Sequence, residues 1–340
     1  MGLLGNILIL VVSIAFLVKA SDFFVDSAEK AGRTLGMPPF IIGALIVAIG
    51  TSLPEVVSSV VAVAENASEI VAGNVVGSNI TNILLALGVA GLFGRHWDPK
   101  TDLFVNGLRI EKDLYAKDIP LFFATALLLY VMLSDGLYSR GEMWFSLFLL
   151  IVYIGYLIVP SKQSDSEKAA ALKERENYTS EELAHFKDGI ILVAAPIIIY
   201  FSAKFTVDSV IAIATIMDIG KEIIALSAVA LGTSLPEVMV SISAARKGNT
   251  DMVLGNIVGS NIFNSFAAMA IPALFALRHP AETFSLLHIP ESIQTFALPM
   301  TLGATLLFIL IVHDKKISRI EATILLLFYV YFNGHLYGFI

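Results

Sequence analysis

Apolar stretches of about 20 residues, the length needed to cross the hydrocarbon core of a bilayer, recur along almost the whole chain. Hydrophobic residues make up 56% of the 340 positions and charged residues only 15%, against about 25% charged residues in an ordinary soluble domain. The sequence therefore predicts an all-α polytopic membrane protein. The predicted spans are 5–22, 40–63, 69–93, 118–135, 141–160, 188–207, 222–245, 251–277, 294–313 and 319–337.

The positive charges are distributed unevenly among the predicted loops. Of the 22 Lys and Arg residues, 17 fall in loops that follow odd-numbered spans. Cytoplasmic loops carry an excess of Lys and Arg, so we expect the odd loops in the cytoplasm and both termini outside. No basic residue precedes Lys19, so the first span lacks the charged start of a cleavable signal peptide and is interpreted as the first helix.

An internal repeat divides the chain. Residues 50–82 match residues 232–264 at a constant offset of 182, with 18 of 33 positions identical. Both copies contain the motifs Gly-Thr-Ser-Leu-Pro-Glu and Gly-Asn-x-Val-Gly-Ser-Asn-Ile. Five predicted spans separate the copies, and an odd number reverses their direction through the membrane, so the halves are predicted to be inverted repeats. Such repeats place ion sites at their interface near the bilayer midplane.

The repeat also predicts the domain organisation. We expect a first five-helix half at 1–160 and a second at 188–340, joined by a charged cytoplasmic linker at 161–187. The repeated segments within the halves are expected at about 40–93 and 222–277.

Two carboxylates are predicted to lie at membrane depth. Glu55 is some fifteen residues into an apolar span, and Glu237 occupies the same place in the second copy. A charge near the bilayer centre is costly, so such residues are usually functional. Pro54 removes the helical partner of a carbonyl near Gly50, which frees another oxygen. Alternatively, Ser52 to Glu55 form a capping box that restarts a kinked helix; the two interpretations are compatible.

The second motif places polar residues on one helix face. Asn74, Ser78 and Asn82 are spaced four apart, and the second copy repeats this stripe. We expect oxygen ligands at Ser78, Asn82, Ser260 and Asn264, and packing or bracing of carbonyls at Asn74, Asn79, Asn256 and Asn261. The alternative is close helix packing through Gly73-x-x-x-Gly77 and Gly255-x-x-x-Gly259.

The predicted cation ligands are carboxylate, hydroxyl, amide and carbonyl oxygens. Such donors suit Ca²⁺ and Na⁺, whereas Zn²⁺ or Cu²⁺ would require imidazole or thiolate ligands. The chain has no cysteine, and its six His residues are scattered in predicted loops and span ends. We find no nucleophile–base pair or phosphate loop, so we expect a transporter and not an enzyme.

The paired motifs resemble the two α-repeats of the cation/Ca²⁺ exchanger superfamily, and the whole chain is similar to its prokaryotic Na⁺/Ca²⁺ antiporter branch. The resemblance implies ten transmembrane helices in two inverted five-helix repeats. It implies Na⁺/Ca²⁺ exchange by alternating access in a prokaryotic plasma membrane. It further implies that the chain needs no cofactor, nucleic acid or obligate protein partner.

The resemblance also implies roles for individual residues. Glu55 and Glu237 would bind Ca²⁺ with the carbonyls of Thr51 and Thr233. Na⁺ sites or cavity-lining positions would be Ala48, Ser52, Ser78, Asn82, Ala230, Ser234, Ser260 and Asn264. The spans 5–22 and 188–207, which flank the motifs, would be the gating elements, and Asp26 and Asp208 would have structural roles near the membrane surface.

One position departs from the family pattern. Several relatives carry Asp at the position of Asn264, and the K⁺-dependent branch has acidic residues at these stripe positions. In this chain Asn82 and Asn264 are both amides.

Four alternative functions remain open. They are H⁺/Ca²⁺ exchange with the two glutamates carrying protons, K⁺-dependent exchange, an ion channel with a glutamate selectivity ring, and a purely structural membrane protein.

Overall fold

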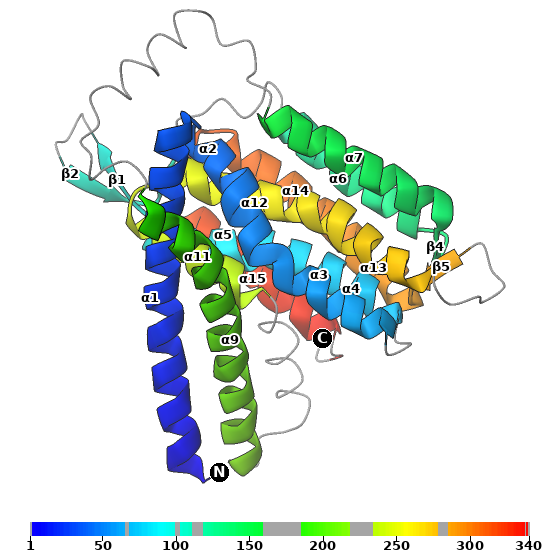
Figure 1. Ribbon diagram of the computed structural model, residues 1–340, viewed down its shortest axis with the longest axis horizontal. Coiled ribbons are helices and arrows are strands. Elements are labelled where there is room, and N and C mark those ends of the chain that lie inside the picture. The colour runs from blue at the N-terminus through cyan, green and yellow to red at the C-terminus, as the bar shows by residue number, and fades with distance from the viewer. Residues whose placement is uncertain are drawn as a thin grey trace, which may run out of the picture.

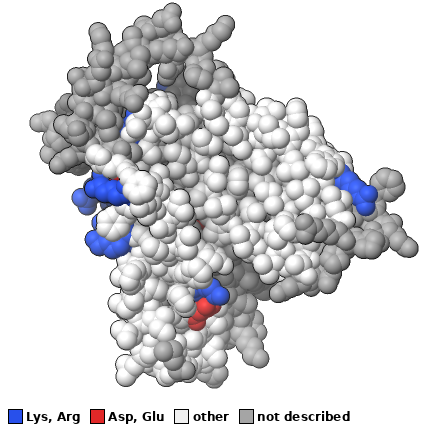
Figure 2. Space-filling view, in the orientation of Figure 1, with Lys and Arg blue, Asp and Glu red and all other residues white. Residues whose placement is uncertain are grey.

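Long apolar helices make up most of the chain (Figure 1). The structure, a computed structural model, describes residues 2–64, 68–98, 103–110, 118–158, 185–217, 234–277, 285–336 and 338. Seven helical stretches among these residues are long and apolar enough to cross a bilayer, and α6 (Asp118–Leu133) is a shorter apolar helix. Broad uncharged areas cover the visible face (Figure 2), as expected for a surface in contact with lipid.

The described residues up to 158 contain five helical stretches. They are α1 (Leu3–Leu35); the continuous helix α2 (Pro39–Ile41), η1 (Ile42–Val47) and α3 (Ala48–Ala64); the continuous helix α4 (Glu69–Thr81), η2 (Asn82–Ala86) and α5 (Leu87–Phe93); α6 (Asp118–Leu133); and α7 (Arg140–Ile158).

The described residues from 185 onward contain the remaining helices. They are α9 (Phe186–Ile216); α11 (Leu235–Arg246); α12 (Thr250–Phe263) with η3 (Asn264–Ala268) and α13 (Met269–Ala276); η4 (Ile293–Ala297) with α14 (Leu298–Val312); and α15 (Arg319–Leu336). A described helix overlaps each of the ten predicted ranges, but the predicted span 222–245 is described only in the part that forms α11.

Helices of both repeats form the centre, while α1 and α9 lie at the periphery. In the most apolar window of Thr250–Ala276, 89% of residues are buried, compared with 22% in α1 and 28% in α9. α1 and α9 run side by side and project away from the other helices (Figure 1). They are antiparallel, because Ser13 contacts Thr206 and Ser27 contacts Asp188.

Two predicted span boundaries are wrong. The predicted ranges 5–22 and 188–207 continue as helices of 33 and 31 residues. At 1.5 Å per residue, α1 is about 50 Å long, well beyond the hydrocarbon core. The helix continues beyond the apolar stretch. Polar residues in the second half of α1, such as Asp22 and Ser27, find partners on neighbouring helices.

The all-α prediction missed short strand pairs in the loops. β1 (Arg95–Asp98) pairs with β2 (Leu103–Asn106), β3 (Leu108–Arg109) with β6 (Lys316–Ile317), and β4 (Leu137–Ser139) with β5 (Ser285–His288), all antiparallel. The two longer-range pairs join loops that are distant in sequence, which no local pattern reveals.

Glycines allow α12 to approach the first repeat closely. A Cβ atom on Gly255 or Gly259 would overlap the backbone of Phe40 or Ala44, and one on Gly43 would overlap the backbone of Met252. The predicted small-residue face is therefore confirmed in the second copy. In the first copy, Gly73 and Gly77 meet no described atom so closely, and the segment equivalent to 40–44, residues 222–226, lies outside the described residues.

This contact predicts the sign of a stability change. Gly259→Ala should lower the free energy of unfolding by about 1–3 kcal/mol, because the neighbouring backbone must move. Helix propensity alone predicts the opposite, a gain of about 1 kcal/mol. Thermal unfolding of the purified protein in detergent measures the change. Gly303→Ala is the matched control, since Gly303 is exposed within α14 and no described atom lies within 4 Å of its added Cβ; equal effects of the two substitutions would contradict the packing account.

Candidate cation-binding site

The two predicted glutamates lie in one buried cluster formed by both repeats. The exposed fraction of Glu55 in α3 is 0% and that of Glu237 in α11 is 1%. Ser52 Oγ of α3 donates to Glu237 Oε1 at 3.2 Å, and Ser78 Oγ of α4 lies 3.2 Å from Glu55 Oε1. The hydroxyls of Ser78 and Ser234 are 2.9 Å apart. Serines of each repeat therefore reach side chains of the other.

The helix that carries Glu55 is not interrupted at the motif. α3 runs from Ala48 to Ala64 with Pro54 inside it, so the capping-box interpretation is wrong in the first copy. In the second copy Ser234 occupies the N-cap position of α11, yet its side chain makes no cap hydrogen bond. Glu237 lies in the first turn of α11, where the helix dipole favours a negative charge.

Asparagines hold the backbone of the site in place. Asn74 Nδ2 donates to the Glu55 carbonyl oxygen at 3.2 Å and to Ser59 Oγ at 3.0 Å. The repeat-equivalent Asn256 donates to Ser241 Oγ at 3.0 Å. The Asn74 contact confirms the predicted bracing of a carbonyl. Each amide also ties its helix to the neighbouring helix that carries a glutamate.

A second asparagine pair links the repeats. Asn261 Nδ2 donates to the Asn79 carbonyl oxygen at 3.2 Å, and Asn79 Nδ2 donates to Ser265 Oγ at 3.1 Å. Asn82 Nδ2 donates to Asn261 Oδ1 at 3.0 Å. The last bond fixes the Asn82 amide so that its own oxygen remains available.

Several buried oxygens in this cluster lack a hydrogen-bond partner among the described residues. They are Glu237 Oε2, Asn79 Oδ1, Asn82 Oδ1 and Asn264 Oδ1, and the Asn264 Nδ2 atom also has none. Asn82 is 1% exposed and Asn264 0%. Leaving one such group buried and unsatisfied costs about 1–3 kcal/mol. A cation bound to such an oxygen would offset that cost.

π-helical turns occur at equivalent places in the two repeats. η2 begins at Asn82 and η3 begins at Asn264. Single π turns are frequent at functional sites because they shift the register of the helix backbone. The sequence offers no signal for a π turn, although the repeat predicts that whatever occurs at Asn82 should recur at Asn264.

The remaining predicted residues divide into two groups. Thr51, Ala48 and Ser260 are buried, with exposed fractions of 1%, 0% and 0%. The Thr51 hydroxyl donates to the Val47 carbonyl at 3.1 Å, and Ser260 Oγ lies 3.4 Å from Asn256 Oδ1. Ala230 and Thr233 lie outside the described residues.

The donor set is made of oxygens. Within the described residues, no three side chains of the His, Cys, Asp and Glu types come together as they would in a transition-metal centre. Two carboxylates, hydroxyls and amides are the ligands that hard cations such as Ca²⁺ and Na⁺ accept in flexible geometry. The cluster therefore has the chemistry of an alkali or alkaline-earth cation site.

Comparison with known proteins agrees with this chemistry. A family model described as "Sodium/calcium exchanger protein" matches residues 5–162 and 188–338. The chain belongs to the sodium/calcium exchanger family. It is 32% identical to the sodium/calcium exchanger MaX1 of Methanosarcina acetivorans, with 96% of this chain and 97% of the relative covered.

Two further comparisons extend the likeness. The exchanger is 34% identical to the inner membrane protein YrbG of Escherichia coli over 78% of both chains. Its structure resembles the solved sodium-calcium exchanger NCX_Mj with a TM-score of 0.74 and 29% identity, covering 97% of this chain and 98% of that one. The protein is thus an integral membrane cation antiporter of the Na⁺/Ca²⁺ exchanger type, and not an enzyme.

The site predicts stabilisation by its cation. Ca²⁺ at 100 times its dissociation constant should stabilise the folded exchanger by about 2.7 kcal/mol and raise its melting temperature in detergent. Glu237→Gln should abolish this shift. Glu69→Gln, the same change at an exposed residue of α4, should retain it, and an unchanged shift in Glu237→Gln would contradict the assignment.

Proposed function

We propose that the exchanger moves Na⁺ and Ca²⁺ in opposite directions by alternating access to a single site centred on Glu55 and Glu237. The observation that carries this proposal is the burial of both carboxylates in one cluster. Among the described residues, Glu237 forms no ion pair with Lys, Arg or His. We infer that its charge is balanced by an ion that the protein carries.

The proposed ligands are those that the family resemblance implies. Ca²⁺ is held by the two glutamates and the carbonyls of Thr51 and Thr233. Na⁺ sites and cavity-lining positions are Ala48, Ser52, Ser78, Asn82, Ala230, Ser234, Ser260 and Asn264. The hydrogen bonds of Ser52, Ser78 and Ser234 to the carboxylates or to one another support this set.

Coupling follows from the cost of buried charge. One Ca²⁺ neutralises both carboxylates, or several Na⁺ ions do so in its place, and the two loads exclude each other because they share ligands. An empty site with two negative charges is too costly to close off in a low-dielectric interior. The exchanger therefore changes sides only when loaded, which prevents a leak.

We also propose ten crossings in two inverted five-helix halves, 1–160 and 188–340, joined by a cytoplasmic linker at 161–187. The strand pairs in the loops support this topology. β3 and β6 follow the predicted third and ninth spans, and β4 and β5 follow the fourth and eighth. In an alternating topology odd loops share one face and even loops share the other. The excess of Lys and Arg in the odd loops supports placing these loops in the cytoplasm and both termini outside. The prokaryotic plasma membrane is what the family resemblance implies.

Flux measurements in proteoliposomes test the proposed exchange. An outward Na⁺ gradient should drive Ca²⁺ uptake with the pH gradient collapsed and without K⁺, because Asn82 and Asn264 add no charge for a further cation. Glu55→Gln and Glu237→Gln should each reduce the rate about 30-fold or more, since a lost buried charge contact costs roughly 2–5 kcal/mol. Glu69→Gln should transport normally.

Three results would oppose the proposal. Uptake that follows a pH gradient and ignores Na⁺ would indicate H⁺/Ca²⁺ exchange, and uptake that requires K⁺ would indicate K⁺-dependent exchange. Transport unaffected by both glutamine substitutions would place the ion path elsewhere.

A further inference from the structure

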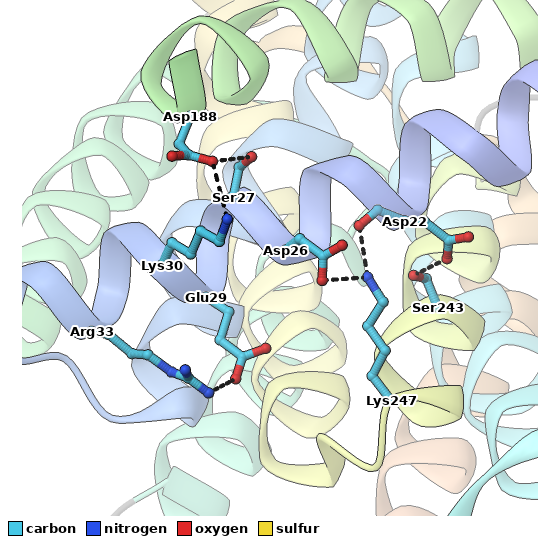
Figure 3. A network of polar contacts seen from close by, with 9 residues as sticks. All are labelled: Asp22, Asp26, Ser27, Glu29, Lys30, Arg33, Asp188, Ser243 and Lys247. Atoms are coloured by element: carbon cyan, nitrogen blue, oxygen red, sulfur yellow. Dashed lines mark hydrogen bonds and ion pairs between the residues drawn. The ribbon is translucent and has the colours of Figure 1, made fainter. Parts of the chain in front are cut away.

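Polar side chains of α1 contact the end of the helix that carries Glu237 (Figure 3). Lys247 Nζ, at the C-cap of α11, lies 2.7 Å from Asp26 Oδ1 and 2.7 Å from the Asp22 carbonyl oxygen. One turn earlier, Ser243 Oγ donates to Asp22 Oδ1 at 2.6 Å. Ser243 and Lys247, at the C-terminal end of α11, thus bind consecutive turns of α1.

The same segment of α1 is also tied to α9. Ser27 Oγ donates to Asp188 Oδ1 at 3.2 Å, and Lys30 Nζ lies 4.0 Å from the same oxygen. Asp188 is buried, and its other oxygen accepts from the His185 backbone N–H at 2.8 Å. Asp188 therefore anchors the start of α9 and the last turns of α1 together.

These ties connect the peripheral pair of helices to the ion site. α11 has only 12 residues, with Glu237 in its first turn and Lys247 directly after its last. A helix of three turns moves as a rigid rod, so displacement of α1 relative to α11 requires the bonds of Ser243 and Lys247 to break or Glu237 to move with them.

The repeat provides an internal comparison at the opposite end. The positions equivalent to Asp26 and Ser243 are Asp208 and Val61. Val61 has no polar side-chain atom and is 48% exposed, and Asp208 forms no ion pair within the described part of the chain. The equivalent of Lys247 is Glu65, which lies outside the described residues. Because Val61 cannot make the bond that Ser243 makes, the polar contact is not a by-product of the repeated fold.

We propose that Asp22, Asp26, Ser243 and Lys247 form a latch that holds the exchanger closed on the side of its Lys- and Arg-rich loops. The latch must open before the ion site is reached from that side. This inference rests on the alternating access of the proposed function. The latch favours one of the two access states, so its strength sets the balance between them.

Cysteine labelling measures this balance without transport. The chain has no native cysteine, so Ala244→Cys places a single thiol at a buried position beside Ser243. A membrane-impermeant maleimide reacts with it only when this end opens. In that background Lys247→Met should raise the labelling rate about fivefold or more, the range of a functional conformational coupling, and Ser243→Ala should raise it less.

Swapping the charges of Asp26 and Lys247 distinguishes loss of their ion pair from a general destabilisation of the fold. Asp26→Lys and Lys247→Glu should each accelerate labelling, and the double variant should label more slowly than either single variant because opposite charges face each other again. Asp208→Asn is the matched control and should label like the parent. Each variant is first checked for a monodisperse size-exclusion profile.

Two outcomes would overturn the latch. One is an unchanged labelling rate in Lys247→Met, which would make Lys247 and Asp26 an ordinary surface ion pair. The other is additivity: the variant with both Asp26→Lys and Lys247→Glu labels as fast as the summed effects of the two single substitutions predict. Failure of Na⁺-driven Ca²⁺ flux in the parent would instead contradict the proposed function, whatever the labelling shows, so the two failures are distinguishable.

Discussion

The burial of two carboxylates in a membrane protein is the constraint on which the rest of this structure depends. Glu55 and Glu237 are almost completely shielded from solvent, where an unbalanced charge is costly. The surrounding residues offer uncharged oxygen ligands. The amides of Asn74 and Asn256 brace the two helices that carry the glutamates. We propose that this arrangement tolerates the negative charges only when a cation is bound, which is the property that an exchanger needs.

The inverted repeat provides the two carboxylates from one sequence pattern, but the structure is not fully symmetric. Ser52 of the first repeat donates to Glu237, and Ser78 donates to Glu55. The contacts of Ser243 and Lys247 with α1 occur where the other repeat has Val61 and Glu65. The repeat brings the two carboxylates together. The contacts found among the described residues in only one repeat would make the two proposed access states unequal in free energy.

Much of this could be predicted from the sequence because the repeat carries spatial information. The constant offset placed Glu55 and Glu237 together, and the four-residue spacing placed Ser78 and Asn82 on one face. The length of α1, the strand pairs and the contact of Lys247 with Asp26 could not be predicted, since each depends on which helices become neighbours. The π turns at Asn82 and Asn264 were equally hidden, because ordinary helix-forming residues adopt them.

Equilibrium binding of radioactive Ca²⁺ to the purified exchanger, measured as Na⁺ is increased at constant ionic strength, tests the central claim most directly. A single site that uses the same carboxylates for both ions predicts that Na⁺ displaces Ca²⁺ completely and lowers its apparent affinity with no plateau. Bound Ca²⁺ that persists at saturating Na⁺, with both ions held at once, would contradict a shared site.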